Sequence, residues 1–533
     1  MLKKYYDYLI IAAVYLIVFW KILFRPVYFL DYSPSVFLSI TKELTVSNFQ
    51  GTWYLYFFLE SIFLRFSQAF FSFSILIMLL IAFYYIKRQF RYSLLFAFVF
   101  FFNPFVYSRL MVGQLGVILA YLLIPVFLYY LFHKKNLIIL AVLTSIALLL
   151  QPQFLLFYLL LFILSYRKPK AVLIFVLLLV LLNAYWIQGF FSPTVFEKID
   201  ESHEEFFAPK LSQDVPAVAK IMGMWGFWRE TGFKTTYKLL PLGLWYALTL
   251  ILVVLMLIGY YSSENRFFFS LWWIGVVFAT GFSHPYTKPF FSFLFNYLPF
   301  FNGFRDSHKF VALIALSYAY LCPLGLRLIT KKSKKLKKIL YLLFISIILL
   351  YTFPLIGLWN QVNPAYPPSD YLDANDFLSK QNITGHIIYL PWEGYLTYNW
   401  TINSTPDGRT AVPINKFIQP LVLVSPGRWG SMSNLKHNIN FCLDHRSINC
   451  LEKQDVLYIL KDRCAFYSDR YKWISISKFY ENNCLTIYRI HNKTDITKRF
   501  KFQLRFVIGS VISILTWICM IFLLLKRKII KNS

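Results

Sequence analysis

The chain has 533 residues, of which 58% are hydrophobic and 15% charged, and its formal net charge is +29. A soluble globular chain is closer to half apolar and a quarter charged, so this composition excludes an ordinary soluble protein. The positive charge does not indicate a nucleic-acid partner, because most of it lies in short clusters between apolar blocks and not on one folded region.

Apolar blocks of about 15 to 22 residues recur along the chain, as in proteins that cross a bilayer repeatedly. They predict a polytopic α-helical membrane protein with about twelve transmembrane helices. The predicted spans are 5–22, 68–86, 92–108, 114–132, 137–150, 153–166, 170–188, 240–260, 267–283, 309–327, 339–358 and 503–525.

Basic clusters orient these spans, because cytoplasmic loops carry an excess of Lys and Arg. With the N-terminus in the cytoplasm, every second junction should be basic. The clusters that satisfy this rule are Lys3–Lys4, Lys87–Arg91, Lys134–Lys135, Arg167–Lys170, Lys331–Lys338 and Lys526–Lys531. We therefore expect a multi-pass plasma-membrane protein with both termini in the cytoplasm.

This orientation divides the chain into three parts. Residues 1–358 form a transmembrane domain with outward loops at 23–67, 190–239 and 283–308. Residues 359–500 form an extracytoplasmic domain. Residues 501–533 hold the final transmembrane helix and a basic cytoplasmic tail.

The domain at 359–500 shows the pattern of a small α/β or α+β fold. A helical stretch at Tyr371–Lys380 precedes four short apolar runs bounded by Pro, Gly and Asn. These runs are His386–Leu390, Leu421–Val424, Val456–Leu460 and Leu485–Ile490.

Cysteines and glycosylation sequons support the outward placement of this domain. Its four cysteines suit two disulfides with three alternative pairings, and zinc is the weaker interpretation because no C-x-x-C unit is present. The cysteines are Cys442, Cys450, Cys464 and Cys484, and the sequons begin at Asn382, Asn399, Asn403 and Asn492. An archaeal cell surface, or a eukaryotic lumen, would provide this environment.

Asp31 follows the first predicted span, in the outward loop 23–67. A carboxylate at this position could serve as a general base toward an acceptor hydroxyl or help hold a divalent cation against a diphosphate. The alternative is a solvated loop acid or a cap before Ser33-Pro34.

The stretch Asn103-Pro-Phe-Val-Tyr-Ser-Arg109-Leu-Met-Val-Gly113-Gln114 joins two predicted spans. Asn103 and Pro104 should break the helix at membrane depth, where freed backbone groups need protein or water around them. We therefore expect a cavity-lining turn, with Arg109 and Gln114 binding substrate. Arg109 suits a phosphate, and the alternative is an interfacial Arg that extends to the headgroups.

A second polar stretch, Arg305-Asp306-Ser-His308-Lys309, precedes the span at 309–327. Four ionisable residues beside an apolar helix are costly unless they pair or face an aqueous cleft. Arg305, His308 and Lys309 could bind a lipid phosphate while Asp306 orients one of them. The alternative is an ordinary charged helix start.

An acidic run from Glu197 to Glu205 is more typical of a solvated loop than of a catalytic site. The chain lacks the phosphate-loop, dinucleotide, zincin and serine-hydrolase motifs. No cofactor motif is present, and a divalent cation is the one cofactor left open, with its ligands unknown.

The order of these motifs resembles that of GT-C-like membrane proteins of archaea and bacteria, including the YfhO-like and arabinofuranosyltransferase-D-like groups. The resemblance rests on the Asn103-Pro-Phe and Phe304-Arg-Asp stretches and covers most of the membrane region. It implies transfer of a sugar from a polyprenyl-phosphate donor to an acceptor on the outer face, with the catalytic acid in the first outward loop.

That role would fall to Asp31. Many GT-C enzymes carry two acids close together there, whereas here the next acid is Glu43, a dozen residues later. The Trp-Trp-Asp-Tyr-Gly motif of oligosaccharyltransferases is absent, so transfer of a glycan to protein asparagine is not expected.

The leading hypothesis is thus a membrane glycosyltransferase. Its expected partners are the lipid bilayer, a polyprenyl-phosphate sugar donor and a glycan, lipid or surface-protein acceptor. The alternatives are a flippase or transporter of a lipid-linked envelope precursor, and a non-catalytic surface scaffold.

Overall fold

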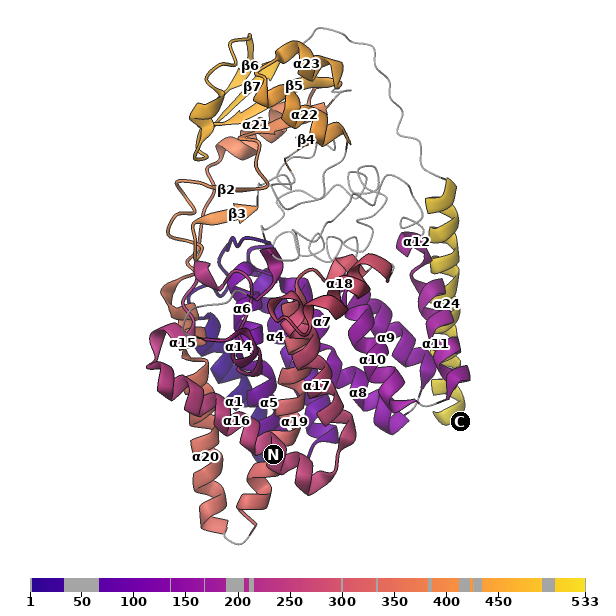
Figure 1. Cartoon of the computed structure of the whole chain (residues 1–533). Helices are drawn as coiled ribbons and strands as arrows, with labels where there is room; N and C mark the ends of the chain where they lie inside the picture. The colour runs from indigo at the N-terminus through magenta and orange to yellow at the C-terminus, as the bar shows by residue number, and fades with distance from the viewer. Residues whose placement is uncertain are drawn as a thin grey trace. The chain divides into compact units, whose positions relative to one another are not determined.

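The computed structural model of this chain describes residues 2–32, 67–134, 136–166, 168–187, 206–209, 215–298, 301–331, 334–381, 386–411, 422–423, 425, 434–490 and 504–532. The chain divides into two compact units, which can be followed by residue number in Figure 1. The first unit holds Met1–Leu23, Ser72–Leu177 and Asp200–Asn360. The second holds Phe24–Phe71, Leu178–Ile199 and Gln361–Ser533.

Apolar helices make up most of the first unit. They are α1 (Leu2–Phe19), α4 (Ser67–Gln89), α5 (Ser93–Phe101), α6 (Pro104–Val112), α7 (Leu115–Leu122), α8 (Ile124–Tyr129), η3 (Tyr130–Lys134), α9 (Leu137–Leu150), α10 (Phe154–Ser165), α11 (Pro169–Leu182), α14 (Ala217–Met222), η5 (Glu230–Gly232), α15 (Thr236–Leu239), α16 (Leu242–Ser263), α17 (Arg266–Thr280), η6 (Gly281–Ser283), α18 (Lys288–Tyr297), η7 (Phe301–Phe304), η8 (Ser307–Phe310), α19 (Val311–Ile329), α20 (Lys334–Tyr351) and η9 (Phe353–Asn360).

Helices occupy each of the predicted spans, and the chain is a multi-pass membrane protein. In the described part of the chain, 6 helices are long and apolar enough to cross a membrane, or up to 8 if each of two bent helix pairs is one span. The remaining apolar helices are shorter, so the predicted total of twelve spans stays a prediction.

The lengths of α9 and α10 show why the positions of helices were easier to predict than the number of membrane crossings. These helices have 14 and 12 residues. At 1.5 Å per residue the longer one extends about 21 Å, less than the hydrocarbon core of about 30 Å. Asn136 fixes the start of α9, since its side chain accepts from the Ile138 N–H at 3.1 Å.

The helix α19 forms the centre of the first unit and packs against α5, α16 and α17. Its side chains are buried on every face from Val311 to Leu326, with Tyr320 and Leu324 as the half-buried exceptions. Gly259 of α16 and Gly325 of α19 let the two backbones meet, because a Cβ on Gly259 would lie 2.0 Å from the Leu321 carbonyl oxygen. Small residues allow this close approach between membrane helices.

The second unit contains a five-stranded mixed sheet. Its strands lie in the order β4 (Val422–Leu423), β1 (His386–Leu390), β5 (Val456–Asp462), β7 (Leu485–Arg489) and β6 (Lys478–Glu481). The pairs β1–β4 and β1–β5 are parallel, whereas β5–β7 and β6–β7 are antiparallel. A separate antiparallel ribbon joins β2 (Tyr395–Thr397) and β3 (Arg409–Ala411).

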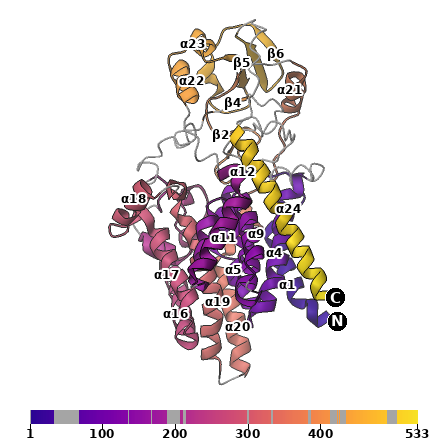
Figure 2. The same ribbon diagram turned by 90° about the vertical axis from the view of Figure 1, so that its right-hand side faces the viewer.

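Helices cover both faces of the sheet, as Figure 2 shows, with α21 (Asp370–Ser379) on one side and α22 (Asn434–Asp444) and α23 (Ile448–Lys453) on the other. The strand period of two explains this arrangement. Ile387 and Tyr389 of β1 pack with α21, whereas Ile388 and Leu390 pack with α22 and α23. The predicted small mixed α and β domain is present.

The four predicted cysteines form two disulfides, Cys442–Cys450 and Cys464–Cys484. Asn399 and Asn403 of the predicted sequons are exposed. Asn382 and Asn492 lie outside the described residues.

The last helix, α24 (Leu504–Asn532), packs in the second unit against α12 (Ala184–Ile187) and the end of α11. The Ser513 hydroxyl accepts from the Tyr185 N–H at 3.0 Å, and the Trp517 indole donates to the Leu182 carbonyl at 3.2 Å. The predicted final span is therefore a helix that contacts the segment after α11.

Asp462 is a buried carboxylate at the end of β5. Its Oδ2 accepts from the hydroxyl groups of Tyr371, at 2.7 Å, and Tyr389. Its Oδ1 accepts from the backbone N–H groups of Cys464 (2.9 Å) and Ala465 (3.1 Å). The carboxylate thus ties α21, β1 and the chain after β5 together.

We expect Asp462 to make this domain less stable as the pH rises from about 4 to about 6. Burial raises the pKa of Asp462 from 3.8 to about 6, despite its hydrogen bonds. The folded state therefore binds more protons than the unfolded state between these values, and its stability falls as the proton leaves, by about 3 kcal/mol at most. Hydrogen exchange of the β1 and β5 amides in the full chain, corrected for intrinsic rates, measures this change.

Asp462→Asn is the matched control, because it keeps the shape and removes the titration. The variant should show a flat stability over this pH range. A wild-type profile as flat as that of the variant would contradict the raised pKa.

Candidate functional site

The predicted helix break at Asn103-Pro104 is present, and α5 and α6 are bent there by 41°. The Asn103 side chain caps α6 by accepting from the Val106 N–H at 3.0 Å. Its amide nitrogen donates to the carbonyl oxygens of Val99 (3.0 Å) and Phe100 (2.8 Å). One side chain therefore satisfies backbone groups on both sides of the break, as an apolar environment requires.

Gly113 ends α6 after nine residues. Its φ of 77° lies in the left-handed region, which glycine adopts without strain. The short helix places Arg109 in its last turn, and Gln114 follows at the start of α7.

Arg109 lies at the centre of a buried polar cluster. Its Nη1 donates to Oδ2 of Asp306 (2.5 Å) and to Oε1 of Gln114 (2.7 Å). Its Nη2 lies 3.0 Å from Nδ1 of His308. Lys309 Nζ lies 3.2 Å from the same Asp306 oxygen. The structure thus joins predicted site residues that are 197 positions apart in the chain.

This cluster combines one carboxylate with two basic side chains. Burial raises the pKa of the Asp306 carboxyl, but Arg109 and Lys309 lower it more, so that this pKa lies well below its usual range. All three side chains are at least nine-tenths buried. Two basic groups beside one carboxylate are an arrangement that suits an anionic ligand.

Aromatic rings enclose the guanidinium of Arg109. Its central carbon lies 4.5 Å from the ring centre of Phe227 and 5.4 Å from that of Phe105. The His308 ring lies between 5.6 and 5.9 Å from the same two rings. These rings add cation–π attraction and keep water away from the Arg109–Asp306 pair.

Ser307 positions the Asp306 segment. Its hydroxyl donates to the Ala279 carbonyl of α17 at 3.0 Å. Gly281 makes room for this contact, because a Cβ there would lie 2.8 Å from the Ser307 hydroxyl oxygen. Asp306 does not cap the following helix, so its carboxylate is committed to Arg109 and Lys309.

Arg305 precedes this cluster and makes a different contact. Its side chain is partly exposed, and its guanidinium carbon lies 4.8 Å from the Phe207 ring centre. Arg305 is therefore the more accessible cation of this segment.

Glu230, which no sequence motif singled out, holds Phe227 in place. Its Oε1 accepts from the backbone N–H groups of Gly226 (2.5 Å) and Phe227 (2.8 Å). Its Oε2 accepts from the Tyr237 hydroxyl at 2.7 Å. Burial raises the pKa of Glu230 above its ordinary value. In the sequence, Glu230 is recognisable only as the single acid in the aromatic, glycine-containing stretch 223–233.

We expect Glu230→Ala to loosen the loop that carries Phe227. The change leaves two buried backbone N–H groups without their acceptor, at a cost of about 2 kcal/mol. Exchange of the Gly226 and Phe227 amides with deuterium should accelerate by about 30-fold. Glu264→Ala, at an exposed position of the same unit, is the control and should leave these amides unchanged. Equal exchange in both variants would remove Glu230 from this role.

Asp31 belongs to the second unit, at an exposed position. Its Oδ1 accepts from the Tyr395 hydroxyl of β2 at 3.1 Å. The other predicted acids, Glu43 and the run 197–205, lie outside the described residues. Among the residues that are described, no three His, Cys, Asp or Glu side chains gather as metal ligands.

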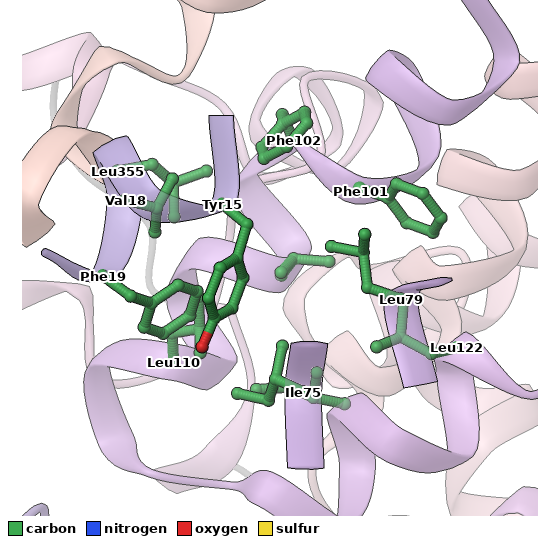
Figure 3. Close-up of a pocket in the computed structure, with 12 residues that line it drawn as sticks. Tyr15, Val18, Phe19, Ile75, Leu79, Phe101, Phe102, Leu110, Leu122 and Leu355 are labelled. Carbon is green, nitrogen blue, oxygen red and sulfur yellow. The ribbon is translucent and has the colours of Figure 1, made fainter. Parts of the chain in front are cut away.

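The first unit also contains an apolar cavity beside the helix break. Figure 3 shows side chains from α1, α4, α5, α6, α7 and η9 that converge on it. The lining includes Phe101, Phe102, Val106 and Leu110 from around Asn103-Pro104. Asn103, Pro104, Arg109 and Gln114 are not among its lining residues, so the substrate-lining role of the turn stays a prediction.

No protein-family model and no curated protein matches the sequence. Solved structures do match it. The cryo-EM structure of the arabinofuranosyltransferase AftD from mycobacteria matches with a TM-score of 0.60 at 12% identity, over 92% of this chain and 40% of that chain. One class of a mutant of AftD matches with a TM-score of 0.57 at 10% identity, over 92% of this chain and 42% of that chain.

This chain has a GT-C-like fold. The likeness concerns the fold alone, because so few residues are identical. The chain spans less than half the length of AftD. The expected GT-C-like fold is confirmed, and membership of the YfhO-like group stays a prediction.

Proposed function

We propose that this chain is a membrane glycosyltransferase that transfers a sugar from a polyprenyl-phosphate donor to a glycan or lipid-linked acceptor on the extracytoplasmic face. The likeness to an arabinofuranosyltransferase over 92% of the chain carries this proposal. A sugar of the arabinofuranose type is therefore the first donor to test.

The buried cluster around Arg109 supports a phosphate-containing donor. Two basic side chains share the carboxylate of Asp306, an arrangement that suits an anion beside them. We assign phosphate contact to Lys309 and the more accessible Arg305. Arg109 is fully buried and holds Asp306, so we assign it to positioning these groups.

In the proposed reaction, Asp31 takes the proton from an acceptor hydroxyl. The hydroxyl oxygen attacks the anomeric carbon of the donor and forms the new glycosidic bond. The bond between that carbon and the phosphate oxygen breaks, and its electron pair leaves with the lipid phosphate. Lys309 and Arg305 stabilise the negative charge of the leaving group.

The proposed setting is an archaeal cell surface, with both termini in the cytoplasm and residues 359–500 outside. The two disulfides and the exposed Asn399 and Asn403 support this orientation. Structural disulfides persist outside the cytoplasm.

The test is sugar transfer by the purified full chain in lipid bilayers. Polyprenyl-phosphate donors carrying arabinofuranose, mannose, glucose or galactose are offered with a glycan and a glycolipid acceptor. A transferred sugar on the acceptor, formed with loss of the donor, supports the proposal. Intact donors throughout the panel would count against a transferase and would favour a lipid-linked-precursor transporter or a scaffold.

A further inference from the structure

The segment that carries Asp31 is anchored on the extracytoplasmic domain by two hydrogen bonds to its backbone carbonyl groups. The Ala365 N–H donates to the Pro26 carbonyl at 3.0 Å. The Thr410 hydroxyl, on β3, donates to the Phe29 carbonyl at 2.9 Å. Both partners lie more than 330 positions along the chain, so this short segment is part of the fold of the second unit.

Two further features hold the segment in one shape. The Tyr28 ring is buried and meets the Trp400 ring edge-on, with 4.9 Å between their centres. The Phe29 N–H donates to the Tyr32 carbonyl at 2.8 Å, which closes a tight turn around Asp31. The turn that holds Asp31 is therefore formed by contacts that do not involve the Asp31 side chain.

The ribbon of β2 and β3 contacts this turn twice. Leu396 of β2 pairs with Thr410 of β3, and Tyr395 directly precedes Leu396 on β2. Thr410 holds the backbone at Phe29, while the Tyr395 hydroxyl donates to the Asp31 carboxylate at 3.1 Å. The β2–β3 ribbon thus contacts both the main chain at Phe29 and the side chain of Asp31.

We propose that Tyr395 is a positioning residue for Asp31. Its hydroxyl fixes Oδ1 of the carboxylate and so sets the direction from which Asp31 takes a proton. The inference rests on the proposed function, in which Asp31 is the general base. It makes the extracytoplasmic domain part of the catalytic machinery and not only a binding module.

The first test is Tyr395→Phe in the full chain, which removes the hydroxyl and keeps the ring. We expect kcat to fall by about tenfold, the effect of losing one hydrogen bond to a charged group, with the KM for the donor unchanged. Tyr366→Phe is the matched control, because Tyr366 is an exposed tyrosine of the same unit. The control should retain wild-type kinetics. A raised KM with unchanged kcat in Tyr395→Phe would overturn the positioning role.

A double-mutant cycle tests whether Tyr395 acts through Asp31. In the Asp31→Asn background, Tyr395→Phe should change the residual rate by less than about twofold, because the base it positions is gone. The same tenfold loss in both backgrounds would show that Tyr395 acts elsewhere, and the proposal would fall.

Chemical labelling tests the contact without any activity. Asp31 is labelled in the folded protein with a water-soluble carbodiimide and glycine ethyl ester, and the product is quantified by mass spectrometry. Tyr395→Phe should speed labelling of Asp31 and leave the exposed Asp376 unchanged. An unchanged rate at Asp31 refutes the contact. If the wild-type chain transfers no sugar, the proposed function is refuted, and so is the catalytic role of Asp31. The labelling result still decides whether Tyr395 contacts Asp31.

Discussion

Asp31→Asn should lower the rate of sugar transfer by about 10²- to 10⁴-fold, the range for loss of a general base. The amide has nearly the size of the carboxylate and can still accept from the Tyr395 hydroxyl. It cannot take a proton from the acceptor. The loss should therefore appear in kcat, with the KM for the donor unchanged, in steady-state assays of the full chain in lipid bilayers.

Asp376→Asn provides the comparison for this result, because Asp376 is an exposed acid on α21 of the same unit. It should transfer sugar at the wild-type rate. Both variants should unfold at the wild-type temperature, which separates lost chemistry from lost structure. Equal turnover in wild type and Asp31→Asn would exclude Asp31 as the base and direct attention to Glu43 or the acids between 197 and 205.

Asp306→Ala should lower the free energy of unfolding by about 3–5 kcal/mol. It leaves the guanidinium of Arg109 fully buried, beside Lys309, without the carboxylate that both contact. Reversible unfolding in mixed micelles titrated with a denaturing detergent, followed by tryptophan fluorescence, measures the change.

A second ion pair of the same unit shows what burial contributes. Lys87 and Asp7 are 2.6 Å apart, but their side chains are about 30% exposed. Asp7→Asn should therefore lower the free energy of unfolding by at most about 1 kcal/mol.

Asp306→Leu combined with Arg109→Leu should lower the free energy of unfolding less than Asp306→Leu alone, because no unpaired guanidinium remains. If Asp306→Ala lowered the free energy of unfolding as little as Asp7→Asn does, Arg109 would have found another acceptor.

The sequence was most informative where a local pattern has a local cause. Apolar blocks predicted where the membrane helices lie, and Asn103-Pro104 predicted the break between α5 and α6. Short apolar runs predicted β1, β4, β5 and β7. The strand β6 was missed because its residues, Lys-Phe-Tyr-Glu, are half polar and lie at the edge of the sheet.

Contacts between distant segments could not be predicted in the same way. Arg109 and Asp306 were both candidate site residues, but their ion pair joins segments 197 residues apart, and residue spacing contains no information about it. The pairing of Asp31 with Tyr395 was hidden for the same reason. Glu230 was missed because its role depends on which backbone N–H groups the loop directs toward it.

The anchoring of the Asp31 turn on the β2–β3 ribbon has a consequence for biosynthesis. Phe29 and its partner Thr410 are 381 residues apart. At about 5–20 residues per second, the ribosome needs roughly 20 to 80 s to reach Thr410 after Phe29 is made. The turn therefore waits without its ribbon while most of the membrane helices are inserted, and it becomes ordered only late in synthesis. A chain released before residue 410 would contain nearly all of the membrane helices and still lack an ordered Asp31.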